Sequence, residues 1–429
     1  MAARKRASPP SAPKAPISGP GPVRVERIGA DGDGVATLQD GAKLYVGNTL
    51  PGELVRPGRL ARRGEGWTAD AIVLEASPDR VAPPCPHFGP CGGCTLQHWR
   101  DEAYARWKSA RVADAVGGAC PTLARTPPAA RRRIDLGIRR EGATVRIGLH
   151  RRRSQDIVDM HACPILHPVL FGVVQALRPV LAGLAGFRRA GSAALNLLDS
   201  GPDLLLRTDA ALSAGDRVLL ADLARSHAMP RVSWAREGSG EAEPAAQLHP
   251  ATNSFGGWRT EIPAGGFLQA SREGEQAIVD AVLAALPPAP RRIVELFAGS
   301  GSLTHTLSTR APVTAYEGDA AAVAALRRAG NGRVRQMHRD LARQPLQAAE
   351  LKGAGAIVLD PPYAGAAAQM PALAATGVPI VYVSCNPGAL ARDARVLLGA
   401  GYRLGSLAAI DQFLWSSSVE SVALFSKGT

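Results

Sequence analysis

The chain has 429 residues and a mass of 44.7 kDa, which is enough for about three domains of ordinary size. Hydrophobic residues make up 46% of it, which excludes wholesale disorder, and no run approaches the ~20 consecutive apolar residues of a membrane-spanning helix. The net charge is +13, and 44 of the 50 basic residues are Arg, a balance that favours phosphate-rich partners such as nucleic acids. The codon bias of a GC-rich genome is the alternative explanation for this Arg content.

Residues 1–16 are basic and Pro-rich with no apolar run behind them, which predicts a disordered tail and a cytoplasmic location. Between residues 17 and 78, short apolar runs alternate with turn sequences such as Asp31-Gly32-Asp33-Gly34. The predicted strands are Val23–Arg27, Val35–Leu38, Lys43–Val46, Glu53–Arg59 and Thr68–Leu74. So many strands in so short a segment indicate a small barrel of the oligonucleotide-binding kind, with another small β domain as the alternative.

The middle of the chain, residues 79–264, predicts mixed helix and strand, an α+β region. A helix is expected at Asp101–Val116. A hairpin follows, in which apolar residues alternate on both sides of Glu141-Gly142. Arginine triplets at 131–133 and 151–153 flank this hairpin and predict a phosphate track, with a solvated rim as the alternative.

From residue 265 to residue 429 the pattern changes to alternating strands and helices. The buried strands are expected at Arg292–Leu296, Val313–Tyr316, Val334–Met337, Ala356–Leu359 and Ile380–Ser384. This alternation predicts an α/β domain with a doubly wound, mostly parallel sheet. The last two strands, Tyr402–Ile410 and Val419–Phe425, are expected to form an antiparallel hairpin at the sheet edge.

A glycine-rich loop, VELFAGSGSL, follows the first of these strands. Gly299 and Gly301 let the backbone approach a ligand, and the next helix offers free N–H groups at its N-terminus. Glu317 ends the second strand, where an acid typically binds a pair of ribose hydroxyls, and Asp340 ends the third. These acids predict an adenosyl-type cofactor such as S-adenosylmethionine; helix-capping acids are the alternative.

Two further loops end the fourth and fifth strands. The first, Asp360-Pro361-Pro362-Tyr363, resembles by itself the motif of methyltransferases that act on adenine N6, whose tyrosine stacks on a flipped base. The second contains Cys385, a candidate nucleophile. Adenine N6 needs no nucleophile from the protein, whereas uracil C5 becomes reactive only after a thiolate adds at C6. Glu420 is the candidate base that removes the C5 proton.

Three cysteines lie close together in the pattern C-x5-C-x2-C, and a fourth follows the Arg-flanked hairpin. These are Cys85, Cys91, Cys94 and Cys163. Four thiolates suit an iron–sulfur cluster or zinc, and we favour a closed structural cluster. His87 is expected to be a neighbour of this site and Cys120 a small buried or half-buried residue.

Together these motifs resemble the bacterial RNA 5-methyluridine methyltransferases that contain a TRAM domain and a 4Fe–4S cluster. The resemblance spans about residues 17–427. It rests on the cysteine cluster, on the loop Ser384-Cys385-Asn386-Pro387 and on the pair Val419-Glu420 near the end of the chain. It implies a TRAM barrel at 17–78, a central RNA-binding region with the cluster at 79–264, and a class I, Rossmann-like methyltransferase domain at 265–429.

The resemblance also implies roles for single residues. Cys385 matches the nucleophile, Glu420 the base, and Cys85, Cys91, Cys94 and Cys163 the cluster ligands. The cofactor-binding positions are Gln269, Phe297, Gly299, Gly301, Ser302, Glu317, Asp340 and Asp360. Three positions depart from the family pattern: Ser302 stands where Asn is common, Tyr363 replaces an Arg, and Ser418 replaces a His.

We therefore expect a monomeric cytoplasmic enzyme, with no membrane partner, that uses S-adenosylmethionine to methylate uracil C5 in RNA. The cluster and the TRAM domain together favour 23S ribosomal RNA over transfer RNA as the substrate. Two other functions stay open: an adenine N6 methyltransferase that uses Asp360–Tyr363, and a non-catalytic RNA-binding or chaperone protein with a decayed active site.

Overall fold

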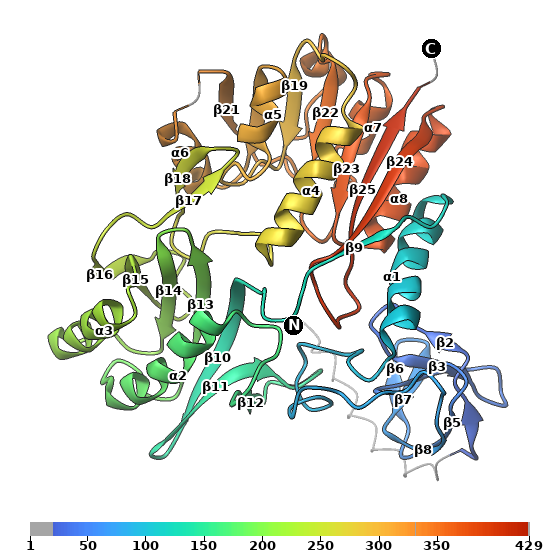
Figure 1. Ribbon diagram of the computed structural model, residues 1–429, viewed down its shortest axis with the longest axis vertical. Coiled ribbons are helices and arrows are strands. Elements are labelled where there is room, and N and C mark those ends of the chain that lie inside the picture. Colours follow the sequence, from blue (N-terminus) through green and yellow to red (C-terminus); the bar gives the residue numbers. More distant parts are fainter. Residues whose placement is uncertain (1–19, 331, 428–429) are drawn as a thin grey trace, which may run out of the picture. The chain divides into compact units, whose positions relative to one another are not determined.

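The computed structural model describes residues 20–330 and 332–427. The chain forms two compact units, of which the first ends at Val81 and the second begins at Ala82 (Figure 1). The disordered tail expected at residues 1–16 lies outside the described residues.

The first unit consists of short strands in two small sheets. One sheet has the order β1 (Val23–Arg24), β5 (Leu54–Pro57), β8 (Ala71–Glu75). The other has the order β2 (Arg27–Ile28), β3 (Gly34–Thr37), β4 (Lys43–Val46), β7 (Gly66–Ala69), β6 (Ala61–Arg63). Leu38, Leu44, Val46 and Ala69 form a buried core.

Each of the five stretches predicted in this unit contains a strand, but two of them are divided. The first is divided at Val25, whose N–H bonds the carbonyl of Glu53 at 2.9 Å as the chain passes from one sheet to the other. The last is divided at Asp70, whose carbonyl accepts from the N–H of Gly58 at 2.8 Å. Strand β6 was not predicted, because its sequence, Ala-Arg-Arg, has no apolar alternation.

The second unit contains a seven-stranded, largely antiparallel sheet. Its order is β12 (Ile157–Asp159), β11 (Thr144–His150), β10 (Arg133–Glu141), β13 (Ala190–Leu198), β14 (Gly201–Thr208), β15 (Arg231–Arg236), β16 (Glu243–Gln247). The predicted hairpin is confirmed as β10 and β11, which turn at Gly142 with a φ of +62°. Helices α2 (Pro168–Gly183) and α3 (Ala214–Ser226) pack on this sheet and share its buried core. A separate hairpin, β17 (Thr252–Phe255) and β18 (Trp258–Glu261), follows.

The same unit contains an eight-stranded sheet that confirms the predicted doubly wound fold. Its order is β21 (Val334–His338), β20 (Val313–Glu317), β19 (Ile293–Leu296), β22 (Ala356–Leu359), β23 (Ile380–Ser384), β25 (Glu420–Ser426), β24 (Arg403–Asp411), β9 (Leu123–Arg125). If the strands from β19 to β25 are numbered 1 to 7 along the chain, they lie side by side in the order 3-2-1-4-5-7-6, and β9 follows at the edge. The first five are parallel and β25 is antiparallel to its neighbours.

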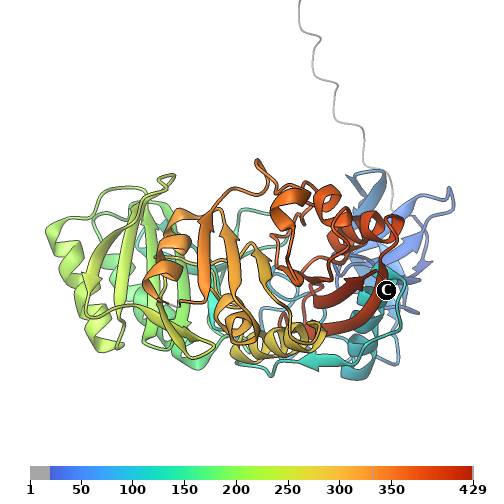
Figure 2. The same cartoon turned by 90° about the horizontal axis from the view of Figure 1, so that it is seen from above.

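Helices cover both faces of this sheet. Helices α4 (Arg272–Ala285), α5 (Thr304–Arg310) and α6 (Ala320–Arg328) pack on one face. Helices α1 (Asp101–Val116), α7 (Met370–Ala374) and α8 (Pro387–Gly399), with the short 3-10 helix η1 (Ala348–Leu351), pack on the other. Figure 2 shows α4, in yellow, on the opposite side of the sheet from the orange-red helices of the second group. Helix α1 has the bounds that the sequence predicts.

The predicted C-terminal hairpin, β24 and β25, is present but does not form the sheet edge. Strand β9 pairs in parallel with β24, opposite Ala409, Ile410 and Asp411, and takes the edge position. The backbone N–H and the hydroxyl of Thr126 both donate to the carbonyl of Asp411, at 3.2 and 3.0 Å. The sheet therefore includes residues that lie far before position 265.

A buried ion pair fixes α1 to the end of β24. Lys108 donates to the carboxylate of Asp411 and, at 3.0 Å, to the carbonyl of Phe413. The hydroxyl of Tyr104 donates to the other oxygen of the same carboxylate at 2.6 Å. The Lys108 and Asp411 side chains are fully buried, and burial lowers the pKa of Lys108 to about 8 against the pull of Asp411.

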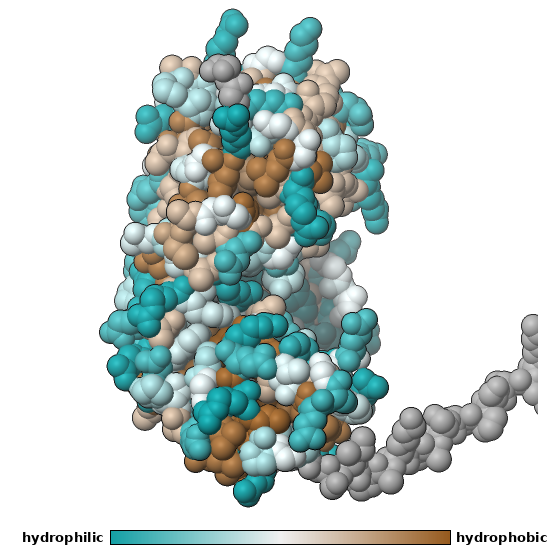
Figure 3. All heavy atoms as spheres, turned by 90° about the vertical axis from the view of Figure 1, so that its right-hand side faces the viewer, coloured by the Kyte–Doolittle hydropathy of each residue, from teal (hydrophilic) through white to brown (hydrophobic). Residues whose placement is uncertain are grey.

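None of the helices in the described ranges is both long and apolar enough to span a lipid bilayer. Figure 3 shows hydrophilic and hydrophobic side chains interspersed on the face that it draws.

Candidate active site

The predicted nucleophile and base meet at the carboxyl edge of the eight-stranded sheet. Cys385 follows β23 directly, and Glu420 is the first residue of β25. Because β23 and β25 are antiparallel with Ser384 opposite Ser421, Cys385 and Glu420 come from neighbouring strand ends. Burial raises the pKa of the Cys385 thiol, and the negative charge of Glu420 raises it further.

Asn386 fixes the loop that contains Cys385. It caps the N-terminus of α8, where its Oδ1 accepts from the N–H of Gly388 at 3.0 Å, and Pro387 occupies the first helical position. Its Nδ2 donates to the carbonyl of Tyr363 at 2.9 Å. The Asn386 amide therefore ties together the loops that follow β22 and β23. The Tyr363 side chain is 67% exposed.

A chain of hydrogen bonds joins Glu420 to Asp360. Nε2 of Gln412 donates to Oε2 of Glu420 at 2.8 Å and to Oε1 of Gln269 at 2.7 Å. Nε2 of Gln269 donates in turn to Oδ2 of Asp360 at 3.3 Å. The backbone N–H of Ala270 donates to Oε1 of Gln412 at 2.9 Å. Four separate segments of the chain thus converge on one buried polar site.

Burial raises the pKa of each titratable group in this site. The pKa of Glu420 rises to about 8, first because of burial and second because of the negative charge on Asp360. Burial also raises the pKa of Asp360 to about 7, against the hydrogen bond from Gln269. The pKa of Cys385 rises to about 12, through burial and then through the charges of Glu420 and Asp360. At neutral pH the free site therefore holds Cys385 as a thiol.

Replacing Glu420 by Gln is expected to speed the alkylation of Cys385 by iodoacetamide. With a pKa of about 8, Glu420 is largely protonated at pH 7, so the two proteins should react alike there. At pH 9 the wild-type carboxylate holds the thiol pKa up, and its removal should speed alkylation roughly severalfold. Peptide mass spectrometry would follow Cys385 separately from the other cysteines. Equal rates at pH 9 would show that Glu420 does not act on the thiol.

The glycine loop after β19 contacts the acid that ends β20. The N–H of Gly299 donates to Oε2 of Glu317 at 2.8 Å. Phe297, Gly299 and Gly301 have positive φ values of +63°, +56° and +101°. The φ of Gly301 strains any residue with a Cβ, and a Cβ there would lie 2.7 Å from Cδ1 of Leu326, so glycine is favoured at this position. The left-handed conformation of Phe297 is a strained backbone of the kind often found at ligand sites.

Two other predicted cofactor positions lie at the rim of this loop region. Asp340 is exposed after β21, and its Oδ1 accepts from the N–H groups of Ala342 and Arg343 at 3.0 and 3.2 Å. These contacts belong to a turn, and the helix-capping role that the sequence left open as an alternative does not apply to Asp340, because the next helical element begins only at Ala348. Ser302 is half-buried just before α5.

Two residues of the site were missed by sequence reasoning. Glu295 lies within β19, and its pKa rises to about 8 because of burial and then the charges of Asp360 and Glu317. The nearby Thr304 hydroxyl lowers this pKa, although within the described residues neither that hydroxyl nor Oε2 of Glu295 makes a hydrogen bond of normal geometry. An acid inside an apolar strand is the signal that could have identified Glu295. Gln412 belongs to no motif and offered no such signal.

The arginine triplets do not form the expected phosphate track as a whole. Arg132 is buried, and it donates to Glu275 at 2.7 Å and to the carbonyl of Gln269 at 3.2 Å. The expectation is therefore wrong for Arg132, because a buried, paired guanidinium is not available to RNA. Arg131 lies close enough to Cys94 and Cys163 for their charges to act on it.

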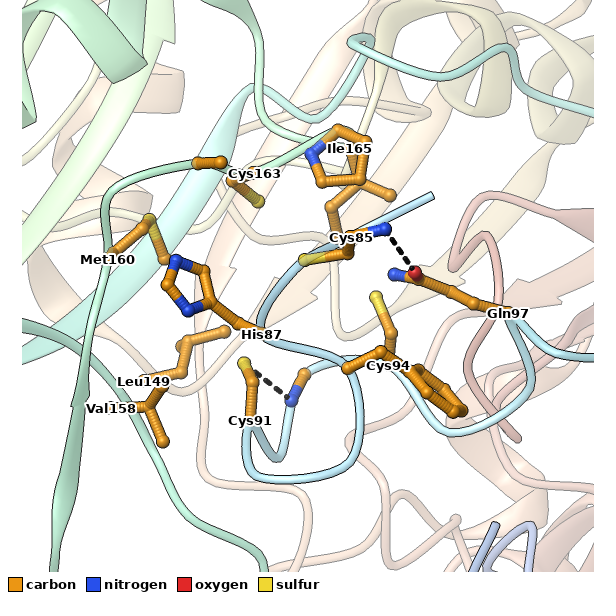
Figure 4. A pocket seen from close by; sticks show the side chains of 14 residues that line it. Cys85, His87, Cys91, Cys94, Gln97, Leu149, Val158, Met160, Cys163 and Ile165 are labelled. Carbon is orange, nitrogen blue, oxygen red and sulfur yellow. Dashed lines mark hydrogen bonds between the residues drawn. The ribbon is translucent and has the colours of Figure 1, made fainter. Parts of the chain in front are cut away.

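The four cysteines expected to bind a cluster line one pocket of the second unit. Figure 4 shows the sulfur atoms of Cys85, Cys91, Cys94 and Cys163 directed toward a common space. The N–H of Gly92 bonds the carbonyl of His150 at 3.0 Å, and a Cβ at Gly92 would lie 2.6 Å from that oxygen. A glycine is therefore required where the cysteine loop meets the end of β11.

Burial raises the pKa of the Cys91, Cys94 and Cys163 thiols, that of Cys94 to about 12. In the part of the chain that the structure covers, no three His, Cys, Asp or Glu side chains are placed to hold a single metal ion. His87 lines the pocket, and its Nε2 accepts from the N–H of His161 at 3.1 Å. Cys120 is exposed, so the expectation that it is buried or half-buried is wrong.

The strand order, the glycine loop and the acids at the strand ends define a class I methyltransferase fold. Residues 332–428 match the family model described as tRNA (Uracil-5-)-methyltransferase. An uncharacterised RNA methyltransferase of Brucella melitensis is 40% identical over 95% of this chain and 98% of its own length. The chain belongs to the RNA uracil-5-methyltransferase family and is an RNA methyltransferase.

Two further relatives extend this comparison. The 23S rRNA (uracil(1939)-C(5))-methyltransferase RlmD of Chromohalobacter salexigens is 34% identical, over 95% of this chain and 89% of its own length. The structure of Pyrococcus abyssi tRNA (uracil-54, C5)-methyltransferase in complex with S-adenosyl-L-homocysteine superimposes with a TM-score of 0.74. It is 20% identical and covers 94% of this chain and 99% of that chain, which confirms the fold.

Proposed function

We propose that this enzyme methylates C5 of uracil in RNA, with 23S ribosomal RNA as the substrate, and so forms 5-methyluridine. The observation that carries the proposal is the placement of Cys385 beside the buried carboxyl of Glu420, at the sheet edge where such folds bind ligands. The name of the Chromohalobacter relative supports the ribosomal substrate. Transfer RNA, the substrate in the name of the Pyrococcus enzyme, is the alternative.

The proposed reaction assigns one step to each catalytic residue. Cys385 releases its proton to solvent water as its sulfur forms an S–C6 bond with uracil, and the electron pair of the C5=C6 double bond moves toward C5 and O4, which makes C5 enolate-like. When bound, S-adenosylmethionine supplies an electrophilic methyl group, whose sulfonium C–S bond breaks as the C5–methyl bond forms. The Glu420 carboxylate takes the C5 proton. The electron pair restores the C5=C6 double bond, and the C6–S bond breaks to return the thiolate.

We propose that the cofactor lies over the glycine loop after β19. Close backbone approach at Gly299 and Gly301 and the unpartnered oxygen of buried Glu295 support a polar ligand there. The residues proposed to contact it are Gln269, Phe297, Gly299, Gly301, Ser302, Glu317, Asp340 and Asp360. Of these, Glu317 is assigned to the ribose hydroxyls, because it ends the second strand of the sheet.

We propose that the four-cysteine pocket holds a 4Fe–4S cluster. Four thiols suit such a cluster, and N–H groups face two of them, from Gly93 to Cys91 at 3.5 Å and from Ile165 to Cys163. A tetrahedral zinc site would need sulfur atoms roughly 3.8 Å apart. All four thiols line the same pocket, which supports a shared ligand between them.

Protein purified without oxygen is expected to be brown, to absorb near about 400 nm and to contain about four iron atoms per chain. Cys94→Ser should lose most of the iron, because Cys94 is one of the four thiols that line the pocket. Cys120→Ser is the control and should keep it, because Cys120 is exposed and is not among the pocket residues. Zinc without iron in the wild-type protein would contradict this assignment.

We further propose that residues 17–78 act as a TRAM barrel, that residues 79–264 bind RNA, and that residues 265–429 contribute most of the catalytic domain. Arg62 lies over the ring of Trp67 and Arg63 over that of Tyr45, at 4.2 and 4.3 Å from the ring centroids. Such pairs suit the stacking of bases in single-stranded RNA. The enzyme is proposed to act as a monomer in the cytoplasm.

The proposed function is tested with unmodified total RNA and methyl-labelled S-adenosylmethionine. Nucleoside mass spectrometry should find the label in 5-methyluridine, and separation of the RNA by size should place it in the large ribosomal RNA. Label in transfer RNA would change the substrate and keep the reaction. Label in N6-methyladenosine would overturn the reaction and favour the Asp360–Tyr363 motif.

A further inference from the structure

We propose that Gln412 is a positioning residue of the methylation reaction: its amide donates to Glu420 and so favours the carboxylate that accepts the C5 proton. The inference rests on the proposed function and adds a residue to it. Gln412 directly follows β24, and its amide is buried between Glu420 and Gln269.

A single backbone contact fixes the orientation of the Gln412 amide. Because Oε1 accepts from the N–H of Ala270 at 2.9 Å, both N–H groups of Nε2 point the other way. They donate to Oε2 of Glu420 at 2.8 Å and to Oε1 of Gln269 at 2.7 Å. A flipped amide would lose all three bonds and place its oxygen against two other buried oxygens. The donor side is therefore always presented to Glu420.

The hydrogen bond from Gln412 opposes the other influences on the protonation of Glu420. Burial and the charge of Asp360 favour the protonated carboxyl, whereas the hydrogen bond from Gln412 favours the carboxylate. Cys385, at the end of the adjacent strand, adds a second negative charge when it forms its thiolate. Without the amide, a smaller fraction of Glu420 would be carboxylate at a given pH, and so less of the enzyme could take the proton from C5.

The cations packed near this site have other partners. Lys108 is engaged by Asp411, the residue before Gln412, and Arg132 is engaged by Glu275. Lys108 also contacts the residues on both sides of Gln412, namely Asp411 at the end of β24 and the carbonyl of Phe413. These contacts fix the position of the Gln412 backbone. Stabilisation of the Glu420 carboxylate is thus assigned to the neutral amide of Gln412. The N–H of Ala270 fixes this amide, and Lys108 fixes the backbone that carries it.

The test uses Gln412→Met, which keeps the length and burial of the side chain but removes its donors. Single-turnover reactions with methyl-labelled S-adenosylmethionine and RNA would be stopped in denaturant and resolved on gels. Methyl transfer should stay near the wild-type rate, while labelled RNA accumulates in a covalent complex with the protein. Release of that complex at pH 7 should slow about tenfold or more.

The pH dependence separates positioning from a general structural role. Loss of the donor raises the pKa of Glu420 further above about 8, so a smaller fraction is carboxylate at any given pH. The midpoint of the release profile should therefore move upward by about one pH unit or more. The matched control is Gln369→Met, because the Gln369 amide is also buried and makes two bonds to Leu346, at 2.8 and 2.9 Å. That control should leave the release profile unchanged.

Each outcome decides between the alternatives. Release at the wild-type rate and pH, or loss of cofactor binding together with methyl transfer, would overturn the role of Gln412. If Gln412→Met does not fold, Gln412→Glu is the second variant, because it preserves the shape of the side chain. Its carboxylate should also slow release of the covalent complex and move the midpoint of the release profile to higher pH. Unchanged release in that variant overturns the proposal. If the wild-type protein itself forms no 5-methyluridine, it is the proposed function that fails.

Discussion

Cys385→Ala is expected to abolish 5-methyluridine formation, with a loss on the order of 10⁴-fold or more. Uracil C5 does not attack a methyl donor unless a nucleophile has added at C6, and Cys385 is the thiol placed beside Glu420 to do so. Affinity for S-adenosylmethionine should stay near the wild-type value, because the glycine loop follows a different strand. Nucleoside mass spectrometry would measure the loss of 5-methyluridine, and a direct binding measurement would check the affinity for S-adenosylmethionine.

Cys120→Ala is the matched control for this experiment. Cys120 is exposed in the segment between α1 and β9, so its loss should leave the activity unchanged. Methylation of uracil that survives in Cys385→Ala would contradict the thiolate mechanism. A protein that binds RNA but never binds the cofactor would instead support the non-catalytic alternative.

Lys108→Met is expected to destabilise the second unit by about 3–5 kcal/mol, the usual cost of leaving one member of a buried ion pair without its partner. The Lys108 and Asp411 side chains are both fully buried, so no water can replace the lost ammonium group. The Tyr104 hydroxyl would remain as the neutral donor to the carboxylate. Chemical denaturation followed by circular dichroism would measure the change in free energy of unfolding.

Arg225→Met provides the comparison for this stability prediction. Arg225 pairs with Asp222 on α3, but their side chains are 59% and 60% exposed. An exposed pair of this kind contributes about 0–1 kcal/mol, because water solvates both charges. If Lys108→Met costs no more than Arg225→Met, the buried pair is not what holds α1 to β24.

The doubly wound sheet could be predicted because its parallel strands β19, β20, β22 and β23 are short apolar runs followed by polar or glycine-rich motifs. The carboxyl ends of parallel strands share one edge, so Glu317, Asp360 and Cys385 could be expected near one another from the sequence alone. The same reasoning fails for β9, since three residues contain too little alternation to reveal a strand. Its position depends on pairing with residues at the other end of the chain.

Contacts made by amides and backbone groups were also beyond sequence reasoning. Gln412 reaches Glu420 and Gln269 only because β24 and the segment before α4 come together in the fold. Arg132 looked like part of a basic surface, yet it is buried and pairs with Glu275, which is more than a hundred residues away in the chain. Polar residues gain such partners from tertiary structure, and their spacing in the chain gives no sign of it.

Strand β9 also affects how the chain folds during synthesis. Its residues leave the ribosome long before Ala409–Asp411, with which they pair. Lys108 of α1 likewise has no carboxylate partner until Asp411 has been synthesised. Until β24 is made, the apolar side of α1 and the edge of β9 have no partner and are open to wrong contacts. Pairing across so long a separation is slow. A nascent or truncated chain that stops before β24 should therefore be a client of chaperones and proteases rather than a partly active enzyme.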